Sequence, residues 1–412
     1  MVVMYRRTND GHISLPMKFS SVFVRTITAC SVTVGLASCA AVHRPPATFE
    51  SLSADAVTAA RAERAAIDTT IERLVRRTIK RGDHTIDVLL LSGGGQHGAY
   101  GAGFLRGWRS RATAAMPTFD LVTGISTGAL QAPFALIGTQ ASLDTLSAIY
   151  LRAAERIAPT FDWFFWLRHT GGLVNTRRYT NTIDDLLRSS FGDQVRAAFT
   201  DGRELRIATT DVDLGIGRTW DLSREYVKGD AGALRTRQLL AAATAIPGIF
   251  PPVIVDGHVH SDGGVIAAVL PMLDLEGYRA LARSLRAHGV NGDVTVRLYI
   301  VMNLWTHAGI EVTDPANRGR LASRAELMLL FAGQPQVLAR LNELSRAVSA
   351  DVPGLKMEVR MTAIPAHFAS EPGAAKLFDK TWMSNLEKVG YERARSASPW
   401  DTVVSGYMRP AH

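Results

Sequence analysis

Two glycine-rich turns contain the residues whose types and spacing best suit catalysis. Residues 124–128 read Gly-Ile-Ser-Thr-Gly, and small residues around Ser126 allow a sharp strand-to-helix turn that exposes its hydroxyl. Residues 92–98 read Ser-Gly-Gly-Gly-Gln-His-Gly, and the backbone N–H groups of such a turn can bind an anion. An acyl-transfer enzyme needs both an attacking hydroxyl and donors for the oxyanion that forms. We therefore predict that Ser126 is a nucleophile.

Other interpretations of the two turns exist. A Gly-x-Ser-x-Gly pattern arises by chance in glycine-rich chains, so it is weak evidence when it stands alone. Residues 92–98 could also form the phosphate-binding turn of a dinucleotide site, but no acidic residue ends a second strand about 20 residues further on. The presence of both turns, each between a strand and a helix, favours acyl transfer.

The elements expected around the two turns are those of a parallel α/β sheet. Residues 88–91 and 119–123 have the length and composition of buried strands. Helices are expected to follow them at residues 97–111 and 126–137. Strands joined by helical crossovers lie parallel, and their carboxyl ends then share one edge of the sheet. The active site is expected at that edge.

The rest of the chain continues the alternation of strands and helices. Residues 253–256 and 258–261 predict a tight hairpin that delivers Asp262 into a glycine turn. Residues 161–166 contain five aromatic side chains, which we interpret as core or, if they are exposed, as a surface that contacts lipid. Further helices are predicted at residues 143–157, 180–191, 234–245, 321–348 with a break at Pro335, and 371–389, and further strands at 204–210, 217–222, 295–303 and 356–364.

Composition limits the class of protein. The chain has 412 residues, of which 47% are hydrophobic, so it can bury a large core. Its formal net charge of +8 is compatible with an anionic surface such as lipid headgroups. The basic residues form no compact motif, so a nucleic-acid partner is not expected. The two cysteines, Cys30 and Cys39, exclude a disulfide framework.

The amino-terminal segment has the features of a secretory signal peptide. From Met17 onward, Lys18 precedes a mainly apolar stretch that ends in small residues. Residues 36–39, Leu-Ala-Ser-Cys, resemble the lipobox of bacterial lipoproteins, in which cleavage precedes a cysteine that is then lipidated. This resemblance implies that Cys39 anchors the mature chain in the membrane. Because Ala40 follows instead of aspartate, it implies the outer membrane, on either its periplasmic side or its surface.

Two alternatives to the lipoprotein signal stay open, namely a plain secretory signal and a single anchor helix. The true start of the chain could be Met1 or Met17. The predicted organisation is a leader at 1–38, a tether at 39–55, an amphipathic helix at 56–85, a catalytic domain at 86–390 and a carboxyl-terminal tail at 391–412. The basic face of the amphipathic helix is interpreted as a solvated surface or as a contact with anionic lipid.

Four sequence blocks in this order resemble the patatin-like phospholipase family. They are residues 93–98, residues 124–128, residues 242–252 with their Ala-Ile-Pro and Phe-Pro-Pro segments, and residues 262–264. The resemblance covers about residues 86–390 and implies a three-layer α/β sandwich with a mainly parallel central sheet. It also implies a lipid acyl hydrolase of the phospholipase A or lysophospholipase type.

The resemblance further implies a two-residue catalytic centre. Ser126 would attack a carboxylic ester and Asp262 would accept its proton directly, so that an acyl-serine intermediate forms and is hydrolysed by water. The residues implied for the oxyanion hole are Gly93, Gly94, Gly95, Gln96, His97 and Gly98. The residues implied for the nucleophile turn and the glycine turn after Asp262 are Gly124, Gly128, Gly263 and Gly264. Many members of the family carry arginine where this chain has His97.

Two other functions are compatible with the same residues. An α/β-hydrolase needs a histidine after the nucleophile and the acid, and His288, His307 and His367 follow Asp262 without a glycine-flanked loop. His258 and His260 precede Asp262 and are interpreted as hairpin surface. The second alternative is a non-catalytic binding lipoprotein with the same fold.

Phospholipids, lysophospholipids, neutral glycerides and small esters all fit as substrates of the predicted hydrolase. The sequence does not predict the oligomeric state.

No cofactor is expected from the sequence. The histidine, cysteine and aspartate residues do not show the spacing of a zinc site, and no Asp-x-Asp-x-Asp calcium loop occurs. A metal is therefore not part of the predicted site.

Overall fold

The computed structural model describes residues 44, 46–153, 160–161, 171–226, 228–376 and 378–401. The chain divides into two compact units, Met1–Cys39 and Ala40–His412, and every element below belongs to the second. The predicted leader at 1–38, the lipidation site Cys39, the aromatic residues 162–166 and the end of the tail at 402–412 lie outside the described residues.

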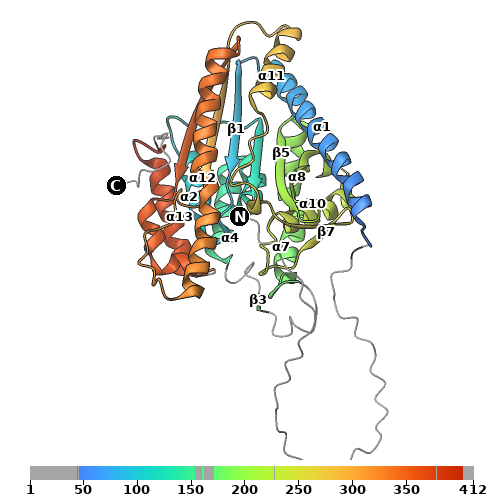
Figure 1. Cartoon of the computed structure of the whole chain (residues 1–412). Helices are drawn as coiled ribbons and strands as arrows, with labels where there is room; N and C mark the ends of the chain where they lie inside the picture. The colour runs from blue at the N-terminus through green and yellow to red at the C-terminus, as the bar shows by residue number, and fades with distance from the viewer. Residues whose placement is uncertain are drawn as a thin grey trace, which may run out of the picture. The chain divides into compact units, whose positions relative to one another are not determined.

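An eight-stranded mixed sheet forms the centre of the described structure (Figure 1). The strand order is β10-β9-β1-β2-β5-β8-β7, and β6 pairs with β5. Neighbours from β10 to β5 are parallel, whereas β6, β7 and β8 make antiparallel pairs. The strands of this sheet are β1 (Thr85–Leu91), β2 (Leu121–Ile125), β5 (Glu204–Asp211), β6 (Ile216–Asp221), β7 (Val253–Val255), β8 (His258–Asp262), β9 (Val294–Met302) and β10 (Leu355–Ala363). A separate two-stranded pair is β3 (Thr160–Phe161) with β4 (Val174–Asn175).

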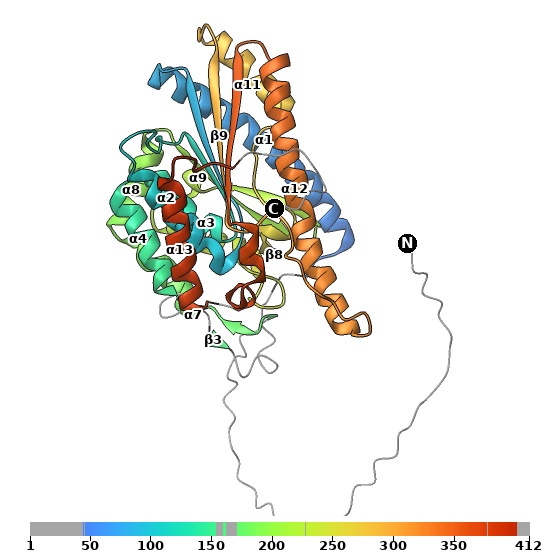
Figure 2. The same ribbon diagram turned by 90° about the vertical axis from the view of Figure 1, so that its left-hand side faces the viewer.

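Helices cover both faces of the sheet and make a three-layer sandwich (Figure 2). One layer contains α2 (Gly98–Arg109), α3 (Thr127–Ile137), α4 (Gln140–Leu151), α7 (Arg177–Arg188), α8 (Ser190–Thr200), α9 (Leu222–Tyr226), α10 (Gly229–Ala243) and α13 (Lys380–Arg395). The other contains α1 (Phe49–Arg81), α11 (Leu275–Ala287) and α12 (Arg318–Asp351). The predicted α/β sandwich with a mainly parallel sheet is therefore confirmed.

Strand β1 shows why its sequence needs two covering layers. Leu89 and Leu91 belong to the hydrophobic cluster under α2 and α13. Ile86, Val88 and Leu90 point to the opposite face and belong to the cluster under α1, α11 and α12. Successive side chains of a strand alternate between faces, so a strand that is hydrophobic at every position must be buried on both.

Helix α1 begins earlier than the sequence analysis expected. It starts at Phe49 instead of residue 56, so the second half of the predicted tether is helical. The reason is a capping box, in which the Thr48 side chain accepts from the Ser51 N–H and the Ser51 side chain accepts from the Thr48 N–H. The helix ends at Arg81, and the φ of 65° at Gly82 continues the chain in the left-handed conformation.

Two other helices differ from expectation. The predicted break at Pro335 is wrong, because α12 runs through this residue. Phe331, Gln334 and Leu338 around it are buried, and this packing outweighs the hydrogen bond that proline removes. Helix α11 was not predicted, although Asp274 caps it by accepting from the Gly277 N–H.

The carboxyl-terminal helix is shifted toward the end of the chain. Helix α13 begins at Lys380 instead of residue 371, because Pro372–Ala375 forms a short 3-10 turn first. It continues to Arg395, beyond the predicted end of the domain at residue 390. Trp400, in the predicted tail, packs against Trp108 at a ring distance of 4.9 Å. The described part of the predicted tail is therefore folded onto the domain.

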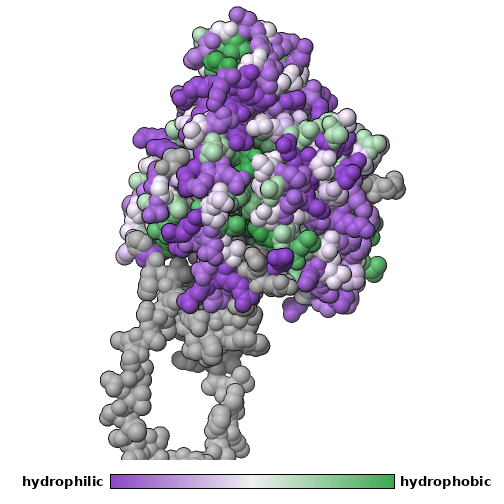
Figure 3. All heavy atoms as spheres, turned by 180° about the vertical axis from the view of Figure 1, so that it is seen from behind, coloured by the Kyte–Doolittle hydropathy of each residue, from purple (hydrophilic) through white to green (hydrophobic). Residues whose placement is uncertain are grey.

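The surface is mainly hydrophilic on the face seen in Figure 3, where it carries small hydrophobic areas. None of the helices in the described ranges combines the length and apolarity that crossing a membrane requires.

Candidate functional site

The predicted site residues meet at the carboxyl ends of two central strands. The turn at residues 92–98 follows β1, and Ser126 follows β2 directly. Asp262 is the last residue of β8. Parallel strands place their carboxyl ends on one edge of a sheet, so the two glycine-rich turns lie next to each other.

Strand β5 brings Asp262 to Ser126. Its first half pairs with β2, up to the pair of Ala208 with Ile125. At the next residue β5 changes partner, and Thr209 pairs with Asp262 of β8. Strand β8 therefore starts to pair at the position where β2 turns away at Ser126. This change of partner places the two side chains beside each other.

Ser126 has a strained backbone that presents its hydroxyl. Its φ is 51° and its ψ is −122°, a conformation that residues with a side chain rarely adopt. Two glycines make the tight turn possible. A Cβ atom on Gly124 would lie 2.4 Å from the Gly128 carbonyl oxygen, and one on Gly128 would lie 2.3 Å from the Leu91 carbonyl oxygen. Glycine is required at both positions because the strand and the helix touch there.

Ser126 and Asp262 are hydrogen-bonded to each other. The Ser126 Oγ donates to Asp262 Oδ2 over 2.5 Å. The other carboxylate oxygen, Oδ1, accepts from the Gly264 N–H at 2.7 Å. Both side chains are buried, with 7% of Ser126 and 4% of Asp262 exposed. Burial raises the pKa of Asp262 to about 6, while the hydrogen bonds from Ser126 and Gly264 act in the opposite direction.

The two glycines after Asp262 fit a crowded corner. A Cβ atom on Gly263 would lie 2.6 Å from the Ala208 carbonyl oxygen. One on Gly264 would lie 3.0 Å from Asp262 Oδ1, the oxygen that the Gly264 N–H contacts. Any larger residue at position 263 would push β8 away from β5 and move Asp262.

The turn after β1 offers backbone donors beside Ser126. Gly94 and Gly95 have positive φ angles of 153° and 56°. A Cβ atom on Gly94 would lie 2.2 Å from the Asn303 carbonyl oxygen, so only glycine fits. Residues Gly95–His97 then form a 3-10 turn, in which the first N–H groups have no partner within the turn.

Not all six residues of the predicted oxyanion hole have a free N–H group. The Gly93 N–H donates to the Ala268 carbonyl at 3.4 Å, and the His97 N–H donates to the Gly94 carbonyl at 3.0 Å. The Gly98 N–H donates back into the turn, to Gln96 and Gly95. The donors best placed for an oxyanion are therefore the N–H groups of residues 94–96.

A buried polar network that the sequence analysis missed holds this turn. Asn303, at the end of β9, donates from Nδ2 to the Ser92 carbonyl at 2.8 Å and to Gln131 Oε1 at 2.9 Å. Gln131 donates in turn to the Gly98 carbonyl at 2.7 Å. Asn303 and Gln131 are fully buried. A polar residue directly after an apolar strand was the available signal at Asn303, whereas Gln131 gave none.

The side chain of Gln96 connects the same turn to the segment before α13. Its Nε2 donates to the Gly373 carbonyl at 3.1 Å and to the Lys376 carbonyl, and its Oε1 accepts from the Asp379 N–H at 2.9 Å. The carboxyl-terminal segment therefore fixes the turn, although Gln96 and Gly373 are 277 residues apart in sequence.

His97 is an uncharged, buried ring between aromatic side chains. Its ring centre lies 5.1 Å from that of Trp305, and its Nδ1 accepts from the Trp382 indole N–H at 2.9 Å. Burial lowers the pKa of His97 to about 4, so the ring is neutral at physiological pH. An arginine at this position would place a permanent charge in this environment.

The histidines considered for a catalytic triad lie apart from the hydrogen-bonded pair. His288 ends α11 and contacts the Ser284 carbonyl, His307 contacts the Thr306 hydroxyl, and His367 packs on Phe368. In the described ranges no histidine hydrogen-bonds to Ser126 or Asp262.

The expectation for the two hairpin histidines was wrong. His258 is 9% exposed and His260 only 1%, so neither lies on the hairpin surface. The reason is that the second half of β8 pairs with β5 and α10 packs on the strand, while the His258 ring also contacts Asp55 of α1.

An apolar pocket lies beside α3, the helix that follows Ser126. Leucine, isoleucine and phenylalanine side chains of α3, α4, α7, α8 and α10 line it. Tyr150 and Tyr179 also line it. The Tyr150 hydroxyl bonds to the Thr127 hydroxyl next to Ser126, and the Tyr179 hydroxyl bonds to Thr244 at 2.7 Å. Burial, with a smaller contribution from the Asp262 charge, raises the pKa of Tyr179.

Residues 89–274 match the family model described as patatin-like phospholipase, which includes both glycine-rich turns and Asp262. Among curated proteins, none matches the chain's sequence. Solved structures that match include the crystal structure of VipD from Legionella pneumophila, with 12% sequence identity and a TM-score of 0.31. That match covers 75% of this chain, and the chain spans 66% of the length of the VipD chain.

Proposed function

Since residues 89–274 of this chain are a patatin-like phospholipase domain, we propose that the protein is a lipid acyl hydrolase that cleaves carboxylic esters with Ser126 and Asp262. The family match supports lipid acyl hydrolysis in general. The observation that carries the more specific mechanism is the hydrogen bond from Ser126 Oγ to Asp262 Oδ2.

In the first step, Ser126 Oγ attacks the carbonyl carbon of the ester. Its proton passes to Asp262 Oδ2, which lies 2.5 Å away. A carboxylate with a pKa of about 6 is ionised at neutral pH but is a better base than an exposed aspartate. The Gly264 N–H holds the second oxygen, so the carboxylate keeps its orientation during the transfer.

The attack converts the carbonyl oxygen into an oxyanion. The backbone N–H groups of residues 94–96 are the donors proposed to stabilise it, and in a comparable hydrolase one such donor contributes about 3 to 4 kcal/mol. When the tetrahedral intermediate collapses, the alcohol leaves with the proton held by Asp262. Water then attacks the acyl-serine with Asp262 as base, and the fatty acid departs.

The apolar pocket supports a substrate with an acyl chain. Leu130 and Phe134 lie on α3, whose amino-terminal end is Ser126, and Ile183 and Leu240 complete the apolar lining. Such a lining suits a hydrocarbon chain and disfavours a charged group. We propose that the first carbons of the acyl chain enter this pocket while the leaving alcohol faces away from it.

The decisive experiment measures fatty-acid release from mixed phospholipid and lysophospholipid vesicles. We expect the purified protein to release fatty acid and both Ser126→Ala and Asp262→Asn to lose at least a hundredfold of that activity while they stay folded. Asp256→Asn, on the exposed turn of the same hairpin, is the matched control and should keep full activity.

Other outcomes point to the alternatives. Retained activity in Asp262→Asn would favour a histidine-based mechanism. A folded wild type that is inactive on these lipids and on small esters would favour a non-catalytic binding protein.

We also propose that Cys39 carries a lipid anchor in the outer membrane. The support is the sequence Leu-Ala-Ser-Cys at residues 36–39, after an apolar stretch. Labelling of cells with a radioactive fatty acid should mark the wild type and Cys30→Ala, but not Cys39→Ala. Labelling of Cys39→Ala would contradict the anchor.

A further inference from the structure

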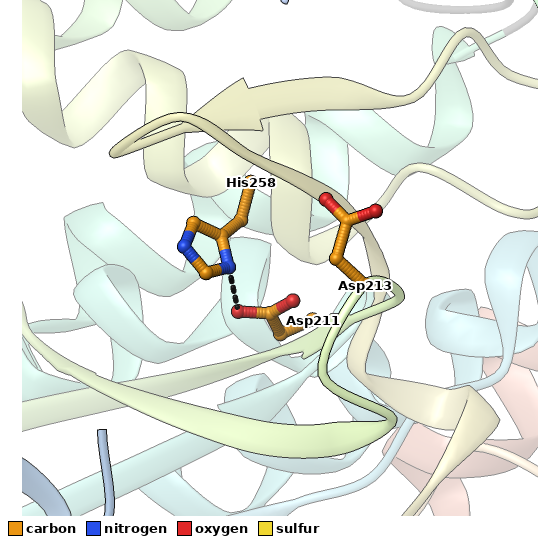
Figure 4. A group of neighbouring side chains, drawn as sticks. All are labelled: Asp211, Asp213 and His258. Carbon is orange, nitrogen blue, oxygen red and sulfur yellow. Dashed lines mark ion pairs between the residues drawn. The ribbon is translucent and has the colours of Figure 1, made fainter. Parts of the chain in front are cut away.

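A cluster of one histidine and two aspartates lies where the end of β5 and its following turn meet the start of β8, the strand that carries Asp262 (Figure 4). Asp211 is the last residue of β5, Asp213 lies in the following turn, and His258 is the first residue of β8. One ligand atom of each residue lies within 4.8 Å of the others. Spacing along the chain did not predict this cluster, because His258 is brought to the aspartates only by strand pairing.

Two atoms of the cluster are buried and have no hydrogen bond. Asp211 is 0% exposed, and its Oδ2 atom lacks a hydrogen-bond partner. The same is true of the Nδ1 atom of His258, a residue that is 9% exposed. The two atoms are 3.0 Å apart and form an ion pair when the ring is protonated, but no hydrogen bond links them. Arg218 and His260 Nε2 lie farther from the same Asp211 Oδ2 atom, at 3.6 and 3.7 Å. Buried polar atoms without partners are costly, so this pair needs an explanation.

The distance fits two ligands of one metal ion. Ligand atoms that each lie about 2.1 Å from an ion are about 3.0 to 3.4 Å apart when the angle at the ion is about 90° to 109°. In that arrangement the lone pair of the ring nitrogen points at the ion and not at the oxygen. Close approach without a hydrogen bond, as at Asp211 and His258, is then expected.

The surroundings hold these residues in the state that a metal requires. The other ring nitrogen of His258, Nε2, lies 3.2 Å from Asp55 Oδ2, so it can carry the proton and leave Nδ1 free to bind. Asp213 Oδ2 accepts from the Val259 N–H at 2.8 Å, and Asp211 Oδ1 accepts from the Leu214 N–H at 3.0 Å. A carboxylate behind the histidine and donors to the ligating carboxylates are typical of protein metal sites.

The charges nearby set the strength of binding. Two arginines oppose a cation, since Arg44 pairs with Asp213 and Arg218 lies 3.6 Å from Asp211. Arg218 also lies 3.5 Å from Glu63, so its charge is shared between two carboxylates. Together with Glu63, the two aspartates of the cluster outnumber the two guanidinium groups. The cluster therefore favours a cation, with lower affinity than a closed structural site.

We propose that Asp211, Asp213 and His258 bind one divalent transition-metal ion, with Zn²⁺ as the best probe and water completing its coordination. The imidazole ligand selects first-row transition ions over Ca²⁺ and Mg²⁺, which prefer oxygen ligands. Asp213 would bind through Oδ1, which would then give up its contact with Arg44, while Oδ2 keeps the hydrogen bond from the Val259 N–H. The ion would join the turn after β5 to β8 and so hold the strand that carries Asp262 in place. Its role is structural, and it is separate from the chemistry at Ser126.

The test is zinc binding to the metal-stripped full chain. Cys30 and Cys39 are replaced by serine in every sample, so that thiols do not contribute. Zn²⁺ is titrated in competition with a chromophoric chelator, and Co²⁺ is titrated while its visible absorption is followed. We expect one ion per chain, no competition from Ca²⁺ or Mg²⁺ at equal concentration, and a higher melting temperature with Zn²⁺.

Variants distinguish this site from adventitious binding. His258→Gln and Asp213→Asn should each lower the zinc affinity at least tenfold, whereas His288→Gln, on the exposed end of α11, should not change it. If His258→Gln fails to fold, Asp55→Asn replaces it, because Asp55 is half exposed and contacts only the far side of the ring. Absence of saturable binding, or equal affinity in the wild type and the site variants, would overturn the proposal.

Discussion

Ser126 Oγ and Asp262 Oδ2 lie 2.5 Å apart because the two residues occupy successive places along one edge of β5. The residue before Ser126 pairs with Ala208, and Asp262 pairs with the next residue, Thr209. The contact therefore depends on strand register and not on a flexible loop. Side chains placed by a rigid sheet keep a geometry suited to direct proton transfer.

The first prediction concerns the pH dependence of activity. Asp262 must be ionised to accept the serine proton, and its pKa is about 6. We expect kcat/KM on a water-soluble ester to fall about tenfold per pH unit below pH 6 and to be level above it. The measurement uses a neutral ester, so that lipid charge does not change with pH. A constant kcat/KM between about pH 4.5 and pH 6 would contradict the role of Asp262.

The second prediction concerns stability. The pKa of Asp262 is raised from 3.8 to about 6, so the folded state binds the proton more tightly than the unfolded state. Its contribution to stability is then fully present below about pH 3.8 and is lost as the pH rises through 6. We expect Asp262→Asn to be more stable than the wild type at pH 8, by about 2 to 3 kcal/mol at most.

Urea unfolding at about pH 8 and about pH 4.5 measures this difference. The extra stability of Asp262→Asn over the wild type should shrink at the lower pH, where the wild-type carboxyl is protonated. Ser126→Ala is a useful comparison, because it removes the hydroxyl donor but leaves the buried carboxylate. A variant Asp262→Asn that is less stable than the wild type at the higher pH would show that the ionised carboxylate stabilises the fold.

Much of this architecture could be predicted from sequence, because the signals are local. Apolar runs before glycine turns indicate strands, and the patterns at residues 92–98 and 124–128 locate two parts of the site. The network of Asn303 and Gln131 could not be predicted in this way. It joins segments that are 172 residues apart, and only the pairing of β9 with β1 brings them together.

Dependence on contacts between distant segments also explains the wrong predictions at Pro335 and His260. Pro335 is a reliable helix breaker only where packing does not hold the helix, and here buried neighbours hold it. The sequence pattern at the hairpin predicts a surface position for His260, whereas the structure buries it. Its burial follows from the pairing of β8 with β5, which no pattern within the hairpin specifies.

The third prediction tests the backbone of the oxyanion turn. In Gly94→Ala the new Cβ atom would lie 2.2 Å from the Asn303 carbonyl oxygen, at a φ of 153° that alanine avoids. The turn must shift, so its backbone N–H groups no longer point at the position proposed for the oxyanion. We expect activity to fall by about a hundredfold or more. Steady-state kinetics on a soluble ester should show the loss mainly in kcat.

The control for this prediction is Gly202→Ala. Gly202 also has a positive φ, of 88°, but no atom lies within 4 Å of the added Cβ. The Gly202→Ala variant should lose about 1 kcal/mol of stability and keep its activity. Equal activity in the two variants would show that the turn at Gly94 does not stabilise the transition state.

The last prediction concerns His97. The ring is 9% exposed and accepts a hydrogen bond from the Trp382 indole N–H. Arginine cannot accept this bond, and its charge would lie between Trp305 and Trp382 with little access to water. Cation–π contact with the two indole rings offsets only part of the free energy that burying the guanidinium charge costs. We expect His97→Arg to lose about 3 kcal/mol of stability, measured by urea unfolding at about pH 8.

His97→Gln is the matched variant, because its side-chain oxygen can still accept from Trp382 and it adds no charge. It should lose less stability than His97→Arg. If His97→Arg is instead as stable as the wild type, the arginine must reach an anion or solvent that the present packing does not provide. In that case the helix turn at residues 95–97 would have to rearrange, and a changed preference for phosphate-bearing lipids over neutral esters would reveal it.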